Sequence, residues 1–313
     1  MTERQSSGRR LRQKWNLAEG SPSPGLADAL EALYLSADLS VISPDPLQLV
    51  LRFHSPEDQE VAGLLAACWA YGRADMIVKN AGEGLDLMGS SPAGFVDAIR
   101  SSDPYALQIF RDLRYRFHRG GDWASLCWFA ADLRKQKGSL GGAIGELWHR
   151  SEGDLQQTLS SFHRAYREGR YPERLKDAGI GLECGSQKHL LPDALQGSAC
   201  KRLNLWLRWM VRKDGVDPGP WKDLAPDGLQ SSDLIIPLDT HIARLGRYLG
   251  LTGYASPGWE MATEITASLS RFDPDDPVKY DFALCRLGIL DLCPKRRDEK
   301  HCERCLILKW CSL

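Results

Sequence analysis

The residues best suited to do chemistry lie at the end of the chain, where four cysteines occur within nineteen residues. They are Cys293, Cys302, Cys305 and Cys311, with the spacing C-x8-C-x2-C-x5-C. Four thiolates in one short loop form the ligand set of a [4Fe–4S] cluster and equally of a structural zinc ion. Unliganded surface thiols are prone to oxidation. The spacing therefore predicts a metal centre and leaves iron–sulfur and zinc open.

A second candidate is an acidic residue at the start of a predicted helix. Residues 236–251 read IPLDTHIARLGRYLGL, and the apolar residues that follow Asp239 recur at helical spacing. Asp239 or Thr240 is therefore expected to cap this helix, because both side chains can accept a hydrogen bond from the first free N–H groups. From composition alone, Asp239 needs no role beyond this cap.

Both features resemble those of one known family. The string from Leu238 to Arg244, LDTHIAR, resembles the V-D-T-H-V-x-R motif of the helix-hairpin-helix DNA glycosylases of the endonuclease III type. The cysteine tail resembles their iron–sulfur loop, C-x6-C-x2-C-x5-C, with a first gap that is two residues longer. The two motifs also occur in the family's order. The resemblance implies a [4Fe–4S] cluster in preference to zinc, a catalytic Asp239, and His241 as a positioning residue at the DNA-binding site. A carboxylate beside the sugar carbon can stabilise an oxocarbenium ion or activate the nucleophile.

The family also carries an L-P-G-V-G hairpin before the aspartate motif. Here the corresponding stretch is Leu191 to Lys201, LPDALQGSACK, in which Leu-Pro and Gly197 are retained. Gly197 and Ser198 are expected to bind a DNA phosphate at the start of the next helix, since helix N-termini attract anions; Arg202 follows as a DNA-binding residue. In bifunctional members a lysine at this helix start forms a Schiff base with the sugar. Lys201 is the nearest match; it either plays that role or belongs to a solvated basic face with Arg202 and Arg208.

Over its length the chain most resembles a bacterial domain-of-unknown-function family related to these glycosylases. The resemblance extends over about residues 26–311. It is carried by four short stretches: EDQEVA at 57–62, AYGR at 70–73, RFHRG at 116–120 and GSACKR at 197–202. The stretch 116–120 either lines a base pocket or forms an interhelical turn.

The elements that must position these residues are predicted to be helices. Residues 60–88 form a long helical region that Tyr71-Gly72-Arg73 can divide, and further helices are expected at 201–213, 241–249 and 258–270. Asp276-Pro277 is typical of an N-cap followed by proline at the first helical position. No strand alternation is evident. The predicted fold class is all-α, with two lobes, a helix-hairpin-helix glycosylase-like arrangement and a C-terminal metal loop of four cysteines.

Composition limits the remaining choices. The 313 residues carry 40 basic and 41 acidic side chains, so bulk charge does not hold this protein to nucleic acid, although local basic clusters such as 295–297 remain. We expect a flexible arm at 1–24, an N-terminal helical region at 25–190, the hairpin and aspartate region at 191–290, and the cluster loop at 291–313. The absence of an apolar N-terminal segment and of a run of about 20 apolar residues predicts a cytoplasmic protein without a membrane partner.

The resemblance implies a monomeric DNA repair enzyme acting in base excision. Such a protein would bind double-stranded DNA, remove a damaged or mismatched base by cleaving its N-glycosyl bond, and add AP-lyase cleavage if Lys201 forms the Schiff base. The N-terminal segment would complete the lobe that carries the metal loop. Two alternatives stay open: a non-catalytic DNA-binding protein with a structural iron–sulfur or zinc centre, and an RNA- or nucleotide-processing enzyme on the same scaffold.

Overall fold

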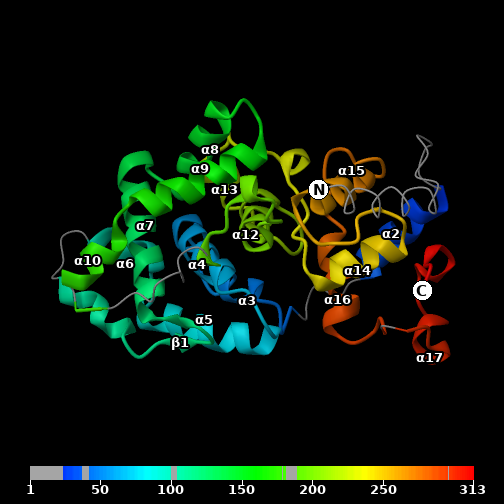
Figure 1. The fold of residues 1–313 in the computed structure, drawn as a ribbon, viewed down its shortest axis with the longest axis horizontal. Helices are drawn as coiled ribbons and strands as arrows, with labels where there is room; N and C mark the ends of the chain where they lie inside the picture. The colour runs from blue at the N-terminus through cyan, green and yellow to red at the C-terminus, as the bar shows by residue number, and fades with distance from the viewer. Residues whose placement is uncertain (1–23, 37–41, 100–103, 178, 181–188, 295) are drawn as a thin grey trace, which may run out of the picture. The chain divides into compact units, whose positions relative to one another are not determined.

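The computed structural model describes residues 24–36, 42–99, 104–177, 179–180, 189–294 and 296–313 (Figure 1). Regular structure in these ranges is helical, apart from one hairpin of two-residue strands and an isolated bridge between Lys213 and Pro218, which confirms the all-α prediction. The arm expected at 1–24 lies outside these ranges except for its last residue, and so does Lys295 of the basic cluster. None of the helices described is long and apolar enough to cross a membrane.

Contacts between Cα atoms divide the chain into two compact units. The C-terminal unit contains the described residues before 37, Gly197–Asn204 and Ser231–Leu313. The central unit contains the described residues of Leu39–Gln196 together with Leu205–Gln230. Because the units are defined by contacts and interleave along the chain, the sequence boundaries at 190 and 290 stay predictions.

The central unit is a set of helices joined by short turns. Its elements are α3 (Leu47–Val50), α4 (Pro56–Cys68), α5 (Ala74–Leu87), α6 (Pro92–Ile99), η1 (Pro104–Phe110), β1 (Arg114–Tyr115), β2 (His118–Arg119), α7 (Gly120–Lys137), α8 (Leu140–Arg150), α9 (Leu155–Glu168), α10 (Tyr171–Asp177), η2 (Ala194–Gln196) and α13 (Trp221–Leu224). Helix α12 (Lys201–Val211) begins in the C-terminal unit and ends in the central one. The chain turns at Tyr71–Arg73 between α4 and α5, as the sequence predicted.

Helix α4 organises the central unit through a buried carboxylate. Ser55 caps the helix by accepting the Asp58 N–H. One turn later, the fully buried Glu60 accepts hydrogen bonds from the backbone N–H groups of Leu140 and Gly141 at the start of α8. The same carboxylate accepts the Trp221 indole N–H from α13 and forms an ion pair with Arg134 of α7. One side chain therefore joins α7, α8 and α13 to α4.

The basic residues of α12 do not form the solvated face that the sequence suggested. Arg202 is 7% exposed, and Arg208 and Arg212 are 2% exposed each. Both of the latter guanidinium groups form ion pairs with the buried carboxylate of Asp217, with Arg208 Nη2 lying 3.1 Å from Oδ1. A buried cation is retained where a carboxylate neutralises it. The alternative of a solvated face that includes Arg202 and Arg208 is therefore wrong for these arginines; Asp217, which pairs with Arg208, follows the end of α12.

The C-terminal unit consists of α2 (Pro24–Ser36), η3 (Ser231–Asp233), α14 (Thr240–Tyr248), α15 (Trp259–Leu269), α16 (Asp281–Ile289), α17 (Glu299–Cys302) and η4 (Leu308–Trp310), together with the start of α12. Helix α2 packs on α16. Lys279 Nζ lies 2.8 Å from Glu31 Oε2 of α2 and 2.7 Å from Asp273 Oδ2. The N-terminal segment thus belongs to the unit that holds the cysteine tail, which agrees with the expectation from the sequence.

The start of α16 differs from the prediction. The helix begins at Asp281, and the N-cap position is Tyr280 instead of Asp276. The residues before it form turns in which Asp273 Oδ1 accepts the backbone N–H groups of Asp275 and Asp276. The sequence predicted that the Asp276 side chain caps a helix. Instead, the backbone N–H of Asp276 is bonded to Asp273 within this turn.

Candidate functional site

Asp239 is the N-cap residue of α14, as the sequence predicted. Its Oδ1 accepts the Ile242 backbone N–H at 2.7 Å, and its own backbone is extended. Four apolar or small residues of the helix are buried behind it, Ile242, Ala243, Leu245 and Gly246. The carboxylate is half-buried. The cap fixes one carboxylate oxygen and directs the other away from the helix.

The second oxygen of Asp239 meets a thiol from another helix. Cys285 Sγ on α16 donates to Asp239 Oδ2 at 3.1 Å. The sequence alone does not bring Cys285 to this site, because 46 residues separate it from Asp239. The sequence signal that could have found it is its spacing of three residues from Phe282, which places both on one face of a helix. A half-buried thiol beside a capped carboxylate restricts the rotation of the carboxylate group.

Two further residues of the LDTHIAR motif hold α14 in place. A Cβ atom built on Gly288 of α16 would lie 1.8 Å from His241 Nδ1, so the imidazole ring rests directly on the glycine backbone. Arg244 Nη2 donates to the carbonyl oxygen of Cys293 at 3.0 Å. His241 and Arg244 thus tie the helix that begins at Asp239 to α16 and to the first cysteine of the tail.

The four tail cysteines lie near one another at the end of the C-terminal unit. Each is half-buried. Burial raises the pKa of the Cys293 thiol; Arg244 lowers it, and the other three thiols raise it further. Backbone bonds from Cys302 N to Asp298 O, Cys305 N to Cys302 O and Cys311 N to Leu308 O fold the loop tightly. Within the described ranges no group of three or more His, Cys, Asp or Glu side chains is arranged as a metal site.

The donor set of the tail nevertheless fits the implied metal centre. Four thiols that influence one another electrostatically are the ligands that an iron–sulfur cluster or a structural zinc ion takes. The tail is also attached to the aspartate helix at both ends. Arg244 bonds Cys293, and Ser312 N donates to Tyr248 O at 2.9 Å. A change in the tail can therefore reach α14 through these bonds.

The predicted phosphate-binding turn precedes α12. Gly197 has φ +81°, a backbone conformation that favours glycine, and a Cβ built there would meet nothing within 4 Å. Its carbonyl oxygen accepts the Trp259 N–H at the start of α15 at 3.1 Å. Ser198 Oγ accepts the Cys200 N–H at 3.2 Å. The space beside Gly197 is therefore unfilled by protein atoms, and the turn is bonded to α15. The Ser198 hydroxyl already accepts a hydrogen bond from the backbone of the same turn.

Lys201 is the first residue of α12 and is half-buried. It lies in the same compact unit as Asp239 and the cysteine tail, although 38 residues of sequence separate it from Asp239. Arg202, the next residue, is 7% exposed, and its role as a DNA-binding residue stays a prediction. Gly197, Lys201 and Asp239 thus belong to one compact unit.

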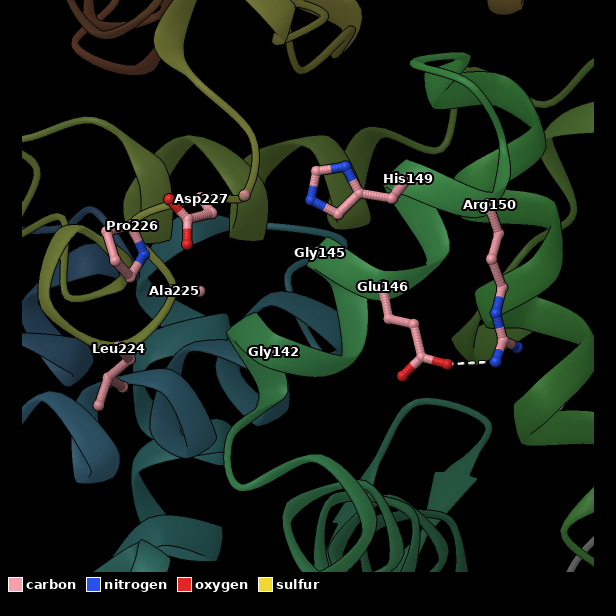
Figure 2. Close-up of a pocket in the computed structure, with 10 residues that line it drawn as sticks. Gly142, Gly145, Glu146, His149, Arg150, Leu224, Ala225, Pro226 and Asp227 are labelled. Atoms are coloured by element: carbon pink, nitrogen blue, oxygen red, sulfur yellow. Dashed lines mark ion pairs between the residues drawn. The ribbon is translucent and has the colours of Figure 1, made fainter.

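One cavity of about 610 Å³ lies in the central unit, between α8 and the segment 224–228 (Figure 2). Its charged lining includes Glu146, His149 and Arg150 of α8, with Asp227 across from them. Glu146 forms ion pairs with Arg150 and Lys137. None of the residues singled out from the sequence lines this cavity. The mixed charges of the lining indicate no particular ligand.

Fold and site together define an all-α protein with a capped aspartate beside a thiol and a cysteine-rich C-terminal loop. A family model described as "Protein of unknown function (DUF2400)" matches residues 45–290. The match covers most of the chain, so the chain belongs to this family, which confirms the expected nearest family. The comparisons with curated proteins and with solved structures found no match.

Proposed function

We propose that this protein is a DNA N-glycosylase that uses Asp239 to remove a damaged or mismatched base. The observation that carries the proposal is the environment of Asp239. One carboxylate oxygen is held by the Ile242 N–H, the other faces the Cys285 thiol, and the turn before Lys201 and the cysteine tail belong to the same unit. The reaction, cleavage of an N-glycosyl bond, is inferred from the resemblance of LDTHIAR at 238–244 to the glycosylase motif.

The chemistry follows from the charge that develops during cleavage of the N-glycosyl bond. As the bond breaks, the base leaves with the bonding electrons and the sugar C1′ becomes positive. A fixed carboxylate stabilises this cation, or removes a proton from an attacking water molecule. Fixing the carboxylate before reaction lowers the cost of reorganisation. Asp239 would fill this role with its Oδ2 oxygen.

Lys201 would add the second activity. Its amine would attack C1′ and form an imine with the opened sugar, which leads to strand cleavage. The four cysteines Cys293, Cys302, Cys305 and Cys311 would hold a [4Fe–4S] cluster, or zinc as the alternative, and a resident cluster would supply structural support for the loop. The partner would be double-stranded DNA with the target base flipped from the stack.

The test is base release from duplexes that each carry one lesion or mismatch. Asp239→Asn keeps the helix cap, because asparagine caps as well as aspartate, so loss of release in this variant reports on the carboxylate. Asp154→Asn is the matched control, since Asp154 caps α9 in the same way through the Gln157 N–H. We expect release by the wild type and by Asp154→Asn, and none by Asp239→Asn.

Three results would contradict the proposal. Equal release by wild type and Asp239→Asn would remove Asp239 from the reaction. Duplex binding without release on any substrate would favour the non-catalytic DNA-binding protein, and release only from substrates with a 2′-hydroxyl would favour RNA processing. Borohydride trapping tests Lys201 separately: the covalent adduct should disappear in Lys201→Gln and persist in Lys222→Gln, an exposed lysine of the central unit.

A further inference from the structure

The stretches 70–73 and 116–120, which are far apart in the sequence, meet at the β1–β2 hairpin. The strands pair Arg114 with Arg119 and Tyr115 with His118, so Arg116 and Phe117 form the tip. Arg116 has φ +55°, which is uncommon outside glycine. The guanidinium of Arg119 stabilises the turn by donating to the Arg116 carbonyl oxygen at 2.8 Å. Phe117 at this tip is 41% exposed.

The ring of Phe117 rests on other aromatic side chains. It stacks on Tyr71 with centroids 5.3 Å apart and planes at 27°, and it meets the exposed His189 edge-on at 4.5 Å. Tyr71 is itself fixed, because its hydroxyl donates to the Tyr115 carbonyl oxygen at 2.9 Å and lies 2.7 Å from Nδ1 of the buried His118. The Phe117 ring therefore packs on Tyr71 and His189, and hydrogen bonds hold Tyr71 in place.

The turn that contains Tyr71 fits closely against the hairpin. Gly72 has φ +97°, and a Cβ there would lie 2.7 Å from the Tyr115 hydroxyl and 3.0 Å from Arg116 Nη1. The guanidinium of Arg116 lies 5.8 Å from the centre of the Tyr71 ring. Only a residue without a side chain permits this approach. The stretches AYGR and RFHRG are therefore in direct contact.

The hairpin that carries the exposed ring is rich in arginine. The stretch from Arg111 to Gly120 contains four arginines and a single carboxylate, Asp112. Arg114 and Arg116 are exposed, and so is Arg111, which forms an ion pair with Asp112. An exposed aromatic ring flanked by guanidinium groups matches the chemistry of an unpaired nucleotide, whose base stacks on the ring while its phosphates meet the cations. A paired base in a duplex cannot offer its face in this way.

We propose that the hairpin tip is a binding site for single-stranded nucleic acid, with Phe117 as the base-stacking residue and Arg114 and Arg116 as phosphate contacts. The site belongs to the central unit and stands independently of the proposed glycosylase activity. It would hold unpaired nucleotides whatever reaction takes place at Asp239.

The experiment measures anisotropy of fluorescent oligothymidylate and oligouridylate of about 12 nucleotides with the full-length protein. Loss of one stacking contact in Phe117→Ala should weaken binding about tenfold or more. Phe117→Trp should keep binding, and Phe117→Leu should lose it, because leucine preserves apolar packing without a flat ring. The matched control is Leu87→Ala, with 43% exposure in the same unit. It should bind like the wild type.

The arginines are tested through salt. Arg116→Gln should weaken binding of all oligonucleotides and reduce the slope of log K against log salt by about 0.7, whereas Arg150→Gln should leave the slope unchanged. Stronger binding of oligouridylate would assign the site to RNA, and stronger binding of oligothymidylate to DNA. Wild-type affinity in Phe117→Leu, or an unchanged slope in Arg116→Gln, would overturn the proposal. Because these probes carry no lesion, failure here is distinguishable from failure of base release.

Discussion

Gly288→Ala tests whether α16 and the aspartate helix meet through His241. The added methyl group would lie 1.8 Å from His241 Nδ1 and 2.3 Å from Cγ. Ordinary contacts between heavy atoms are about 3.5 Å, so the ring or the helix must move by well over 1 Å. Overpacking of this kind costs about 1–3 kcal/mol. Replacing glycine by alanine inside a helix contributes up to about 1 kcal/mol in the other direction.

The sum predicts a net loss of about 1–2 kcal/mol in the free energy of unfolding. The decisive comparison is the same substitution in a His241→Ala background, where the imidazole is gone. There only the helix propensity remains, so Gly288→Ala should stabilise the protein by up to about 1 kcal/mol. The sign of the effect reverses, and the coupling in the double-mutant cycle should be about 2 kcal/mol.

Urea unfolding followed by circular dichroism measures all four proteins of the cycle. The m-value should stay constant if the variants change stability alone. An increase in stability from Gly288→Ala in the wild-type background would refute the reasoning, and so would an equal loss in both backgrounds. The first result would mean that the ring turns aside at no cost. The second would mean that the methyl group meets something other than His241.

Four further predictions concern other parts of the structure. Cys285→Ala should reduce base release about threefold to tenfold by removing one hydrogen bond to the candidate carboxylate, and Cys285→Ser should restore most of it. Glu60→Ala should lower the free energy of unfolding by about 3–5 kcal/mol in urea, because it removes the acceptor of three N–H donors and one of the two carboxylates that pair with the Arg134 guanidinium. Asp273→Asn should cost about 1 kcal/mol or less near neutral pH, with a difference from wild type that shrinks in urea titrations below about pH 4. Cys305→Ser should remove a broad absorbance near ~400 nm, together with bound iron and sulfide.

The pH prediction depends on the sign of one pKa shift. Partial burial raises the pKa of the Asp273 carboxyl, but hydrogen bonds from Lys279 and from the backbone lower it more, so the net pKa lies below its usual value. A depressed carboxyl pKa stabilises the folded state above the unfolded pKa, and this contribution is lost as pH falls through the folded pKa. A difference that grew on acidification would contradict the assignment. Equal activity of Cys285→Ala and wild type would contradict a role for the Cys285 hydrogen bond. A loss of stability below about 1 kcal/mol in Glu60→Ala would contradict the importance of its buried bonds. Stoichiometric zinc in a colourless protein would contradict the iron–sulfur cluster.

Local sequence determined the helices and the cap of the candidate site. The break at Tyr71–Arg73 and the helices beginning at Lys201 and Thr240 were predictable, because helical periodicity and capping depend on neighbours within a few residues. Asp239 was placed correctly as an N-cap, since its partner Ile242 is three residues away. The close spacing of the last cysteines likewise made their proximity predictable.

Tertiary structure decided the contacts whose partners are remote in sequence. Cys285 reaches Asp239 from another helix, and Asp217 neutralises arginines that looked solvent-exposed. The helix start expected at Asp276 moved to Asp281, because Asp273 engages the intervening backbone in turns. Side-chain type and spacing fix what a residue can bond within one turn of helix. Burial and long-range pairing depend on how helices pack, and packing involves all of their surfaces at once.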